Sequence, residues 1–217
     1  MTSLSPTPRS TLTRKKDRAA TDRAALHEVL DEALVCHLGL VLDGSPVVLP
    51  TAHGRDGDTL YFHGSSGSGN LRAAARGIDV CVTVTLLDGL VYARSLNNHS
   101  MNYRSAVVHG NARLVTGEEK TRGLRVITEH LTPGSWDHAR EPSAKEMASV
   151  SVLALDLAEA SVKVRAGDPG EEPDDLQRHE IWAGVVPVRT TLGAPVSAPY
   201  VPEGMPVPAH VAERKLP

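Results

Sequence analysis

Several residue types that mark common classes of protein are scarce in this chain of 217 residues. Aromatic residues make up 3% of it, which argues against a surface that stacks single-stranded bases. The 23 Lys and Arg residues are outnumbered by 26 Asp and Glu residues, and no long basic run is available for a phosphate backbone. No stretch approaches the roughly 20 apolar residues of a membrane span. We therefore expect neither nucleic acid nor a membrane as a partner.

Cysteine is also rare, and Cys36 and Cys81 lie far apart, each within an apolar run. Because they lack the paired spacing of a zinc or redox motif, we interpret them as buried free thiols in a reducing compartment. The N-terminus lacks the apolar region of a secretory signal, so the expected location is the cytoplasm. The 10 histidines form no His-X-His or HExxH pattern, and we predict no metal site.

The remaining composition is ordinary for a globular protein, with 41% hydrophobic and 23% charged residues. Residues 1–17 are rich in Ser, Thr, Pro and basic side chains, which predicts a disordered or extended N-terminal tail. Residues 18–190 are predicted to fold as one domain. Residues 191–217 are Pro-rich without periodicity and are predicted to form a C-terminal arm.

Two helices stand out from the pattern. Apolar residues recur at helical spacing over residues 22–34, which predicts an amphipathic helix. A second helix is predicted to begin at Thr116, which has the spacing of a capping box with Glu119, and to end at Pro133-Gly134.

Short runs rich in Val, Leu and Thr account for most of the other segments. They are separated by Asp43-Gly44, Asp56-Gly57 and Asp88-Gly89, dipeptides typical of tight hairpin turns. The predicted strands span residues 34–42, 46–54, 59–63, 79–87, 90–96, 103–115, 151–157, 161–165 and 180–188. This pattern indicates a mostly β fold with flanking helices, of the α+β class. A small barrel is favoured over a sandwich, because closure removes exposed sheet edges.

A loop of Gly and Ser residues, 64–69, follows one of these strands and precedes a short predicted helix. Backbone N–H groups at such a loop, together with hydroxyls and a nearby cation, suit an anion such as a phosphate. The side chains available for this role are Ser65, Ser66, Ser68 and Arg72. The alternative interpretation is a flexible connection in which Ser68 or Asn70 caps the helix.

Three separated motifs together resemble one family: LYFHGSSGS at 60–68, SMNYRSAVVHG at 100–110 and IWAGVVP at 181–187. The chain is similar to the pyridoxamine 5'-phosphate oxidase-like split barrels, in particular the branch related to nitroimidazole-resistance proteins. The likeness covers about residues 18–190. It implies an FMN-binding split β-barrel that forms a homodimer, with two FMN molecules in clefts between the subunits.

The resemblance also implies a site. The segment matching residues 48–51 lines the isoalloxazine ring, and the segment matching residues 62–65 holds the ribityl phosphate together with the loop that follows. His63 is placed beside the flavin as a proton donor or polar anchor and is the candidate catalytic residue. The expected cofactor-binding residues are Val48, Leu49, Pro50, Thr51, Phe62, His63, Gly64, Ser65, Ser68, Asn70, Arg72, Trp182 and Arg189.

Two of these residues, Trp182 and Arg189, are expected to close the cleft from the second subunit. Tyr103 and Arg104 are expected to brace the dimer interface.

The chain departs from the family at one position. Many relatives carry an adjacent Arg-Lys pair for the phosphate, whereas this chain has Gly69-Asn70, which leaves Arg72 as the nearest cation. Loss of a charge-assisted contact of about 1.5–3 kcal/mol weakens binding roughly tenfold to a hundredfold. Haem and a deazaflavin, used by other split barrels, are therefore the alternative cofactors.

The expected function is that of an FMN-dependent oxidoreductase acting on a small organic substrate such as a nitro compound. The alternative is a non-catalytic flavin-, deazaflavin- or haem-binding carrier or sensor.

Overall fold

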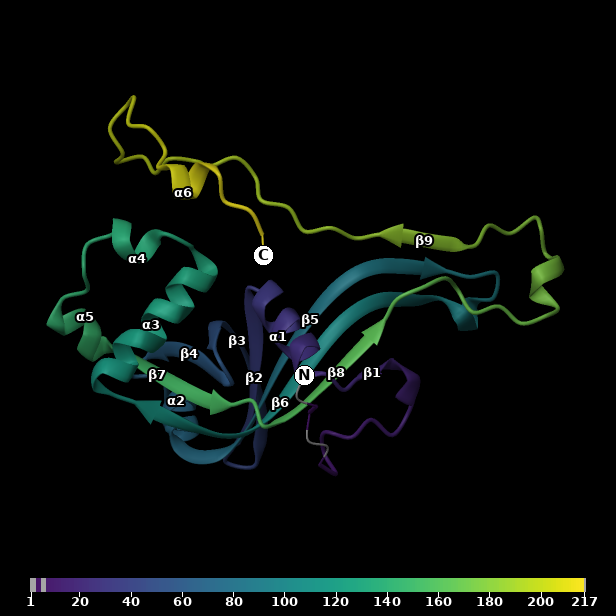
Figure 1. Ribbon diagram of the computed structural model, residues 1–217, viewed down its shortest axis with the longest axis horizontal. Coiled ribbons are helices and arrows are strands. Elements are labelled where there is room, and N and C mark those ends of the chain that lie inside the picture. The colour runs from purple at the N-terminus through teal and green to yellow at the C-terminus, as the bar shows by residue number, and fades with distance from the viewer. Residues whose placement is uncertain (1–2, 5–6, 217) are drawn as a thin grey trace.

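Figure 1 shows the fold in a computed structural model that describes residues 3–4 and 7–216. Within this part of the chain, one antiparallel sheet has the strand order β1-β8-β6-β7-β4-β3-β2-β5-β9. The strands are β1 (Ala19–Ala20), β2 (Val35–Leu42), β3 (Ser45–Asp56), β4 (Thr59–Ser65), β5 (Arg76–Tyr92), β6 (Ser100–Val115), β7 (Val150–Asp156), β8 (Glu159–Arg165) and β9 (Gly184–Pro187). The helices are α1 (Arg23–Glu32), α2 (Gly69–Ala75), α3 (Gly117–Leu131), α4 (Ser135–His138), α5 (Ala144–Ser149) and α6 (Ala209–Ala212).

The sheet closes into a barrel because β6 pairs with β5 as well as with β7. The ring of strands therefore runs β6-β7-β4-β3-β2-β5 and back to β6. Residues 103–109 of β6 pair with β8, whereas residues 113–115 pair with β7, so two strands share one side of β6 in succession. This arrangement is a split barrel, and it confirms the fold class predicted from the sequence.

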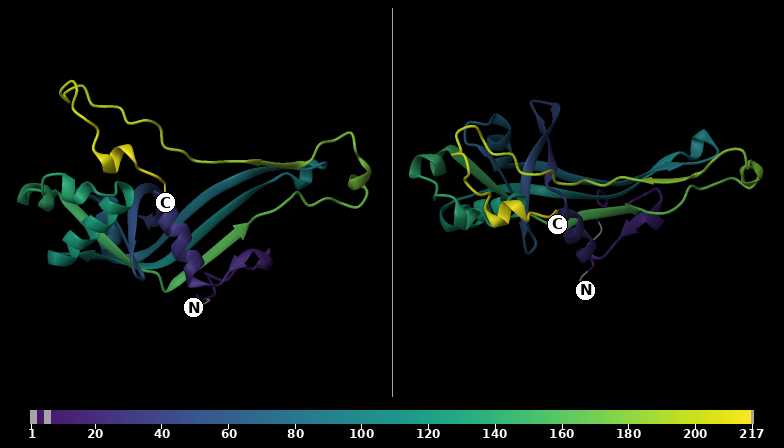
Figure 2. Two further views of the ribbon diagram at one scale, coloured as in Figure 1. Left: turned by 45° about the horizontal axis from the view of Figure 1, so that its top comes forward. Right: turned by 90° about the horizontal axis from the view of Figure 1, so that it is seen from above.

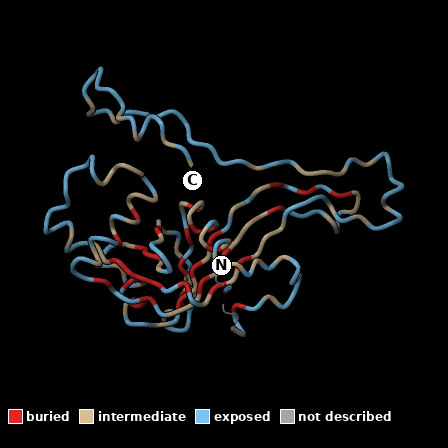
Figure 3. Tube along the Cα trace, viewed as in Figure 1, coloured by how far each residue is buried: buried red, intermediate tan, exposed pale blue. Residues whose placement is uncertain are grey.

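The hydrophobic core fills the barrel interior, as the clustering of buried residues in Figure 3 shows. Strand β4 contributes Leu60 and Phe62, each 0% exposed, to this interior. Helix α1 covers it with Leu26, Val29 and Leu30, the apolar stripe that the sequence predicts. Tyr61 lies on the other face of β4 and packs in a second, smaller cluster beneath α3.

The turn predictions are confirmed at two positions and wrong at the third. Asp43 and Gly44 have φ angles of 48° and 79°, as expected for a tight turn between β2 and β3, and Gly57 (φ 58°) turns the chain into β4. Asp88-Gly89 is not a turn, because β5 continues through it. The pairing with β6 shifts register between Leu87 and Gly89, which is a bulge. The two predicted strands 79–87 and 90–96 are therefore parts of one long strand.

The predicted capping box of the second helix is also wrong. Thr116 precedes α3 but forms no side-chain cap hydrogen bond. Glu119 instead accepts hydrogen bonds from Arg113, at 2.8 and 2.5 Å, and from the hydroxyl of Tyr61, at 3.2 Å. Its carboxylate is thus committed to the barrel, since two donors on β4 and β6 outcompete the local backbone.

Strands β5 and β6 extend beyond the barrel as a long hairpin, which Figure 2 shows from two sides. Strand β9 pairs with the far part of β5, at residues 89–92. Beyond β9 the chain returns as an extended arm above the barrel, and α6 lies near α3 and α4 (Figure 1). No helix in the described part of the chain is both long and apolar enough to span a bilayer.

Part of the predicted N-terminal tail, residues 1–2 and 5–6, lies outside the described residues. In the remainder of it, Arg9 forms ion pairs with Asp79 of β5 and Glu159 of β8, at 2.5 and 2.7 Å. These contacts bring the segment against the barrel.

Candidate functional site

The site begins where β3 separates from β4. Their pairing stops at His53 and Phe62, so residues 45–52 of β3 pair only with β2. Because backbone groups alternate between the two edges of a strand, half of the N–H and C=O groups in this stretch face an open edge. Pro50 lies in this stretch, where a residue without a backbone N–H is tolerated because the outer edge has no partner strand. Val48, 65% exposed, and Pro50 also present apolar side chains there.

His63 lies beside this open edge, on the face of β4 opposite the barrel core. The hydroxyl of Thr51 donates to the backbone carbonyl of His63 at 3.2 Å, which ties the free part of β3 to the end of β4. The Nδ1 atom of His63 is buried and has no hydrogen-bond partner among the described residues. Burial lowers the pKa of the imidazole, since desolvation disfavours the charged form. A neutral ring with one unpaired nitrogen is therefore presented next to β3.

The Gly/Ser loop follows directly. The backbone N–H of Gly67 donates to Ser65 Oγ at 3.2 Å, and the N–H of Leu71 donates to Ser68 Oγ at 3.4 Å. The alternative prediction that Ser68 caps the helix is confirmed. Both hydroxyls accept in these bonds and keep their own hydrogen to donate elsewhere.

Helix α2 is held close to β4 by a glycine. A Cβ at Gly64 would lie 2.2 Å from a methyl carbon of Leu71, so the packing of α2 onto β4 leaves no room for a side chain there. Leu71 is buried by this packing, whereas Arg72 is exposed and Asn70 is half-buried. The guanidinium of Arg72 is thus free to meet a ligand that approaches from solvent.

The structure joins Thr51 to His63 and places the other predicted residues of this set on the open stretch of β3, at the end of β4, in the Gly/Ser loop or on α2: Val48, Leu49, Pro50, Gly64, Ser65, Ser68, Asn70 and Arg72. It does not bring the Phe62 side chain to them, because alternation along β4 directs this ring into the barrel core.

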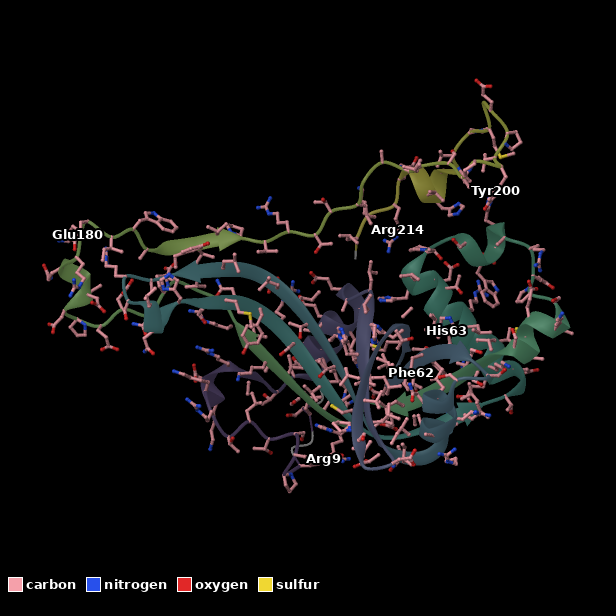
Figure 4. All side chains as sticks on the ribbon, turned by 180° about the vertical axis from the view of Figure 1, so that it is seen from behind. Arg9, Phe62, His63, Glu180, Tyr200 and Arg214 are labelled. Carbon is pink, nitrogen blue, oxygen red and sulfur yellow. The ribbon has the colours of Figure 1, made fainter. Side chains whose placement is uncertain are left out.

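Trp182 lies at the far end of the hairpin, whereas Arg189 follows β9 next to Val188, whose N–H donates to the carbonyl of Asp88 at 3.0 Å. Trp182 precedes β9, and its ring centroid is 6.0 Å from that of Tyr92 on the far part of β5. Helix α2 adjoins the other end of β5 at Arg76, and the strand from there to Tyr92 spans roughly 50 Å at about 3.3 Å per residue. Figure 4 shows Glu180 near the tip of the hairpin and His63 within the body of the barrel.

Arg104 has a role within the chain that the motif SMNYRSAVVHG does not reveal. Its guanidinium pairs with Glu32 of α1 and with Asp88 at the bulge of β5, where one contact measures 2.7 Å. These two carboxylates raise the pKa of Arg104. This interaction joins the helix, the bulge and β6.

Four histidines near the end of α3 form two pairs that no motif in the sequence marks. His53 and His130 have ring centroids 5.1 Å apart, and His138 and His210 are 4.7 Å apart. No sequence spacing could have found these pairs, since each joins distant segments. Among residues 3–4 and 7–216, no group of three metal-ligating side chains comes together.

A split barrel in which an open stretch of β3 meets a Gly/Ser loop defines the class of this protein: the folds similar to pyridoxamine 5'-phosphate oxidase. The family model described as pyridoxamine 5'-phosphate oxidase matches residues 22–164, and the chain belongs to this family. The comparison with curated proteins gave no match.

Solved structures resemble the chain over different lengths. The flavocytochrome Anf3 from Azotobacter vinelandii is 36% identical, with a TM-score of 0.91, over 99% of this chain and 100% of that one. The FAD and haem binding protein from Mycobacterium smegmatis is 39% identical, with a TM-score of 0.87, over 90% and 96%. A 5-nitroimidazole antibiotic resistance protein from Bacteroides thetaiotaomicron is 26% identical, with a TM-score of 0.58, over 67% and 86%.

Proposed function

We propose that this chain is a redox protein that binds a flavin and a haem. The observation that carries this proposal is the extent of the structural match. The likeness to the flavocytochrome and to the FAD and haem binding protein spans 99% and 90% of the chain, whereas the family model ends at residue 164. The likeness to the two-cofactor proteins therefore extends over β9 and much of the arm, which lie beyond the residues that the family model matches.

The flavin is proposed to lie against the open stretch of β3. The unpaired backbone edge there offers donors and acceptors to a heteroaromatic ring, and the neutral His63 offers the unpaired Nδ1 atom. Ser65 and Ser68 retain hydroxyl hydrogens for a phosphate, and Arg72 supplies the positive charge. These features fit a flavin, which when bound supplies one- and two-electron transfer.

Within this site, each side chain has a separate task. Thr51 holds the end of β4 against β3 through its 3.2 Å bond to the His63 carbonyl. His63 stays neutral near pH 7, because burial lowers its pKa, and it can exchange a hydrogen bond without placing a charge beside the ring. FMN, expected from the resemblance, and FAD, named for one neighbour, share the ring and ribityl phosphate that these residues would contact.

A homodimer is proposed as the working unit. Trp182 cannot reach the loop of its own subunit across roughly 50 Å, so it can close a flavin site only from a second copy. Arg189 is proposed to act with it. Large apolar side chains also lie exposed on the strands, as expected of a surface that meets another subunit. They include Val35, Val41, Val48, Leu87, Leu90 and Met101. Light scattering should give a dimer mass, and a monomer with flavin still bound would contradict the proposal.

The thiols favour a reducing compartment. Cys36 and Cys81 are both free, and burial raises the pKa of Cys36 to about 12, which keeps it as an unreactive thiol. We propose the cytoplasm as the location, as expected from the sequence.

Oxidoreduction of a small organic substrate such as a nitro compound is the second candidate. The likeness to the nitroimidazole-resistance protein favours it, because that match is 26% identical and includes the barrel. It covers only 67% of this chain, however, so it does not explain the presence of the C-terminal arm.

The test is the absorption spectrum of the purified protein, titrated in turn with FMN, FAD, a deazaflavin and ferric protoporphyrin IX. We expect uptake of a flavin and of the porphyrin together. Absence of flavin uptake would overturn the proposal, and uptake of flavin alone would remove its haem half.

Photoreduction of the bound flavin without oxygen then separates the two candidates. Reduction of the bound haem without added substrate supports the two-cofactor protein. Reoxidation of the flavin only after addition of a nitroaromatic compound supports the second candidate.

A further inference from the structure

A pocket of about 370 Å³ lies between strand β8 and the N-terminal segment, by which we mean the described residues 3–4 and 7–21. Figure 1 shows this segment beside β8. We call the hollow the β8 pocket. Its volume is at the low end of the roughly 300–1,000 Å³ that is usual for small-molecule sites. It shares no residue with the open stretch of β3, the Gly/Ser loop or α2, so a ligand bound in it leaves the flavin site free.

The floor of the β8 pocket is apolar and continuous with the barrel core. Ala160 and Val162 of β8 line it and are 3% and 1% exposed. Strand β1 pairs with β8 and sets Ala20, which also lines the pocket, opposite Val162. Leu4, 8% exposed, packs in the same core cluster. The small side chains of the two alanines leave the space that larger residues would fill, and packing within the core keeps this floor in place.

The N-terminal segment is tied over the pocket by Arg9 and Thr7. Arg9 forms ion pairs with Asp79 and Glu159, at 2.5 and 2.7 Å. The hydroxyl of Thr7 donates to Glu159 Oε1 at 2.5 Å, and the Thr7 N–H donates at 2.8 Å to Oγ of Ser10, which lines the pocket and is 6% exposed. These hydrogen bonds from Arg9 and Thr7 lower the pKa of Glu159 to about 2. Both carboxylates therefore already have partners and do not offset a charge inside the pocket.

Among the described residues that line the pocket, Lys16 is the one charged side chain. It is exposed and forms no ion pair with another described residue. The rest of the lining is apolar or carries a hydroxyl group. A cation beside an apolar wall attracts an anion and repels a second cation. The ligand that matches this lining has an apolar body and one negative charge.

We propose that the β8 pocket binds an aliphatic carboxylate of medium chain length, with its chain along Leu4, Ala160 and Val162 and its carboxylate beside Lys16. A single ammonium group matches one carboxylate better than a phosphate dianion, which takes several charge-assisted hydrogen bonds. The volume suits one short chain rather than a segment of another protein. This inference goes beyond the proposed function and does not depend on it, because the two sites share no residue.

The test is isothermal titration calorimetry of the full-length protein, as purified, with butanoate, hexanoate and octanoate at physiological ionic strength. We expect the affinity to rise roughly fourfold for each added CH₂ group that the pocket buries, and to level off once the chain fills it. An affinity that does not depend on chain length would overturn the proposal. So would a rise that continues through dodecanoate together with sedimentation on phosphatidylglycerol vesicles, because these results indicate a lipid surface as the partner.

Charge reversal at the lysine tests the position of the carboxylate. Lys16→Glu should weaken octanoate binding about tenfold, whereas binding of uncharged octan-1-ol should stay the same. Lys15→Glu is the matched control, because this neighbouring lysine is also exposed but does not line the pocket. Equal effects of the two variants on octanoate would mean that only the general charge of the segment matters, and would overturn the site.

Two further variants test the pocket itself. Ala19→Trp, at an exposed position of the lining, should block binding of both octanoate and octan-1-ol while circular dichroism and flavin uptake stay the same. Arg9→Ala should weaken binding of both compounds together, because it removes the ion pairs that hold the segment over the pocket. Octanoate affinity that is unchanged in Ala19→Trp would place the ligand elsewhere and overturn the proposal.

The outcomes keep this inference separate from the proposed function. No binding of octanoate by a protein that takes up its flavin would overturn the β8 pocket as a ligand site and leave the flavin proposal intact. Binding of octanoate that is lost in Lys16→Glu and kept in Lys15→Glu would support the site even if flavin uptake fails.

Discussion

The two ends of β5 differ in what holds them. At the α2 end, the chain is surrounded by barrel strands and the buried side chains of the core (Figure 3). At the β9 end, one short strand of four residues pairs on a hairpin, and the arm beyond it is mostly exposed. Positions near α2 are therefore set by packing within the chain. Positions near β9 and along the arm have few packing contacts within the chain, so substitutions there should affect stability little.

The largest expected effect on stability comes from removing a core side chain in the packed region at the α2 end of β5. Phe62→Ala should lower the free energy of unfolding by about 3–5 kcal/mol, because the ring is 0% exposed and its removal leaves a cavity. Urea unfolding of the cofactor-free protein measures this, with Phe62→Leu as the conservative control. A loss of flavin affinity with no loss of stability would mean that the ring faces the ligand instead of the core.

The next effect is a loss of stability of the same packed region at low pH. Burial lowers the pKa of His53 to about 4, whereas the unfolded chain binds this proton near 6.5. The unfolded state therefore holds more protons between these values, and stability present above pH 6.5 is lost as the pH falls toward 4. The expected loss from pH 7 to pH 4.5 is about 2 kcal/mol.

Urea midpoints at the two pH values check this prediction. His53→Gln should reduce the pH dependence, while His99→Gln, at an exposed position, should keep it. Equal slopes in the wild-type protein and His53→Gln would contradict it.

A smaller effect is expected on the ligand side of the packed end. Arg72→Ala should weaken flavin binding about tenfold, the low end for a charge-assisted contact, because the side chain is exposed and screened by solvent. Fluorescence quenching gives the dissociation constant, and Arg76→Ala, at an exposed position just beyond α2, is the control. An unchanged constant in Arg72→Ala would remove this residue from the site.

The smallest effect on stability is expected at the β9 end of β5. Trp182→Ala should change the free energy of unfolding by no more than about 0.5 kcal/mol, because the ring is 65% exposed. It should nevertheless weaken flavin binding if the ring acts in the second subunit. Binding measured above and below the concentration at which the dimer dissociates checks this. A flavin affinity that changes neither with the Trp182→Ala substitution nor with dissociation of the dimer would place the ring outside the site.

The parts of the fold that could be predicted from sequence are those set by local pattern. Asp43-Gly44 forms a turn because the positive φ angles that these residues tolerate are the ones needed to connect the paired strands β2 and β3. Asp88-Gly89 has the same residue types, yet β6 and β9 pair on both sides of it, and continuous pairing outweighs the local preference for a turn. The Thr116 cap failed for a similar reason, since Glu119 meets Arg113 and Tyr61 from distant strands.

The candidate site divides in the same way. Thr51, His63 and Ser68 could be found because they lie in or next to strands with recognisable motifs. The contact between Gly134 and His210 could not be found, since His210 reaches Gly134 only through the return of a C-terminal arm that has no periodicity. Neither its length nor its composition specifies where it lies.

The open stretch of β3 has a consequence for the protein before any ligand binds. An unpaired strand rich in valine and leucine is a template on which a strand of another molecule can add, which is the first step of aggregation. Pro46 and Pro50 punctuate this stretch and offer no N–H to an incoming strand. The open edge can therefore contact a small ring but pairs poorly with a β-strand of another molecule. The newly made protein is thus protected from aggregation before its cofactor binds.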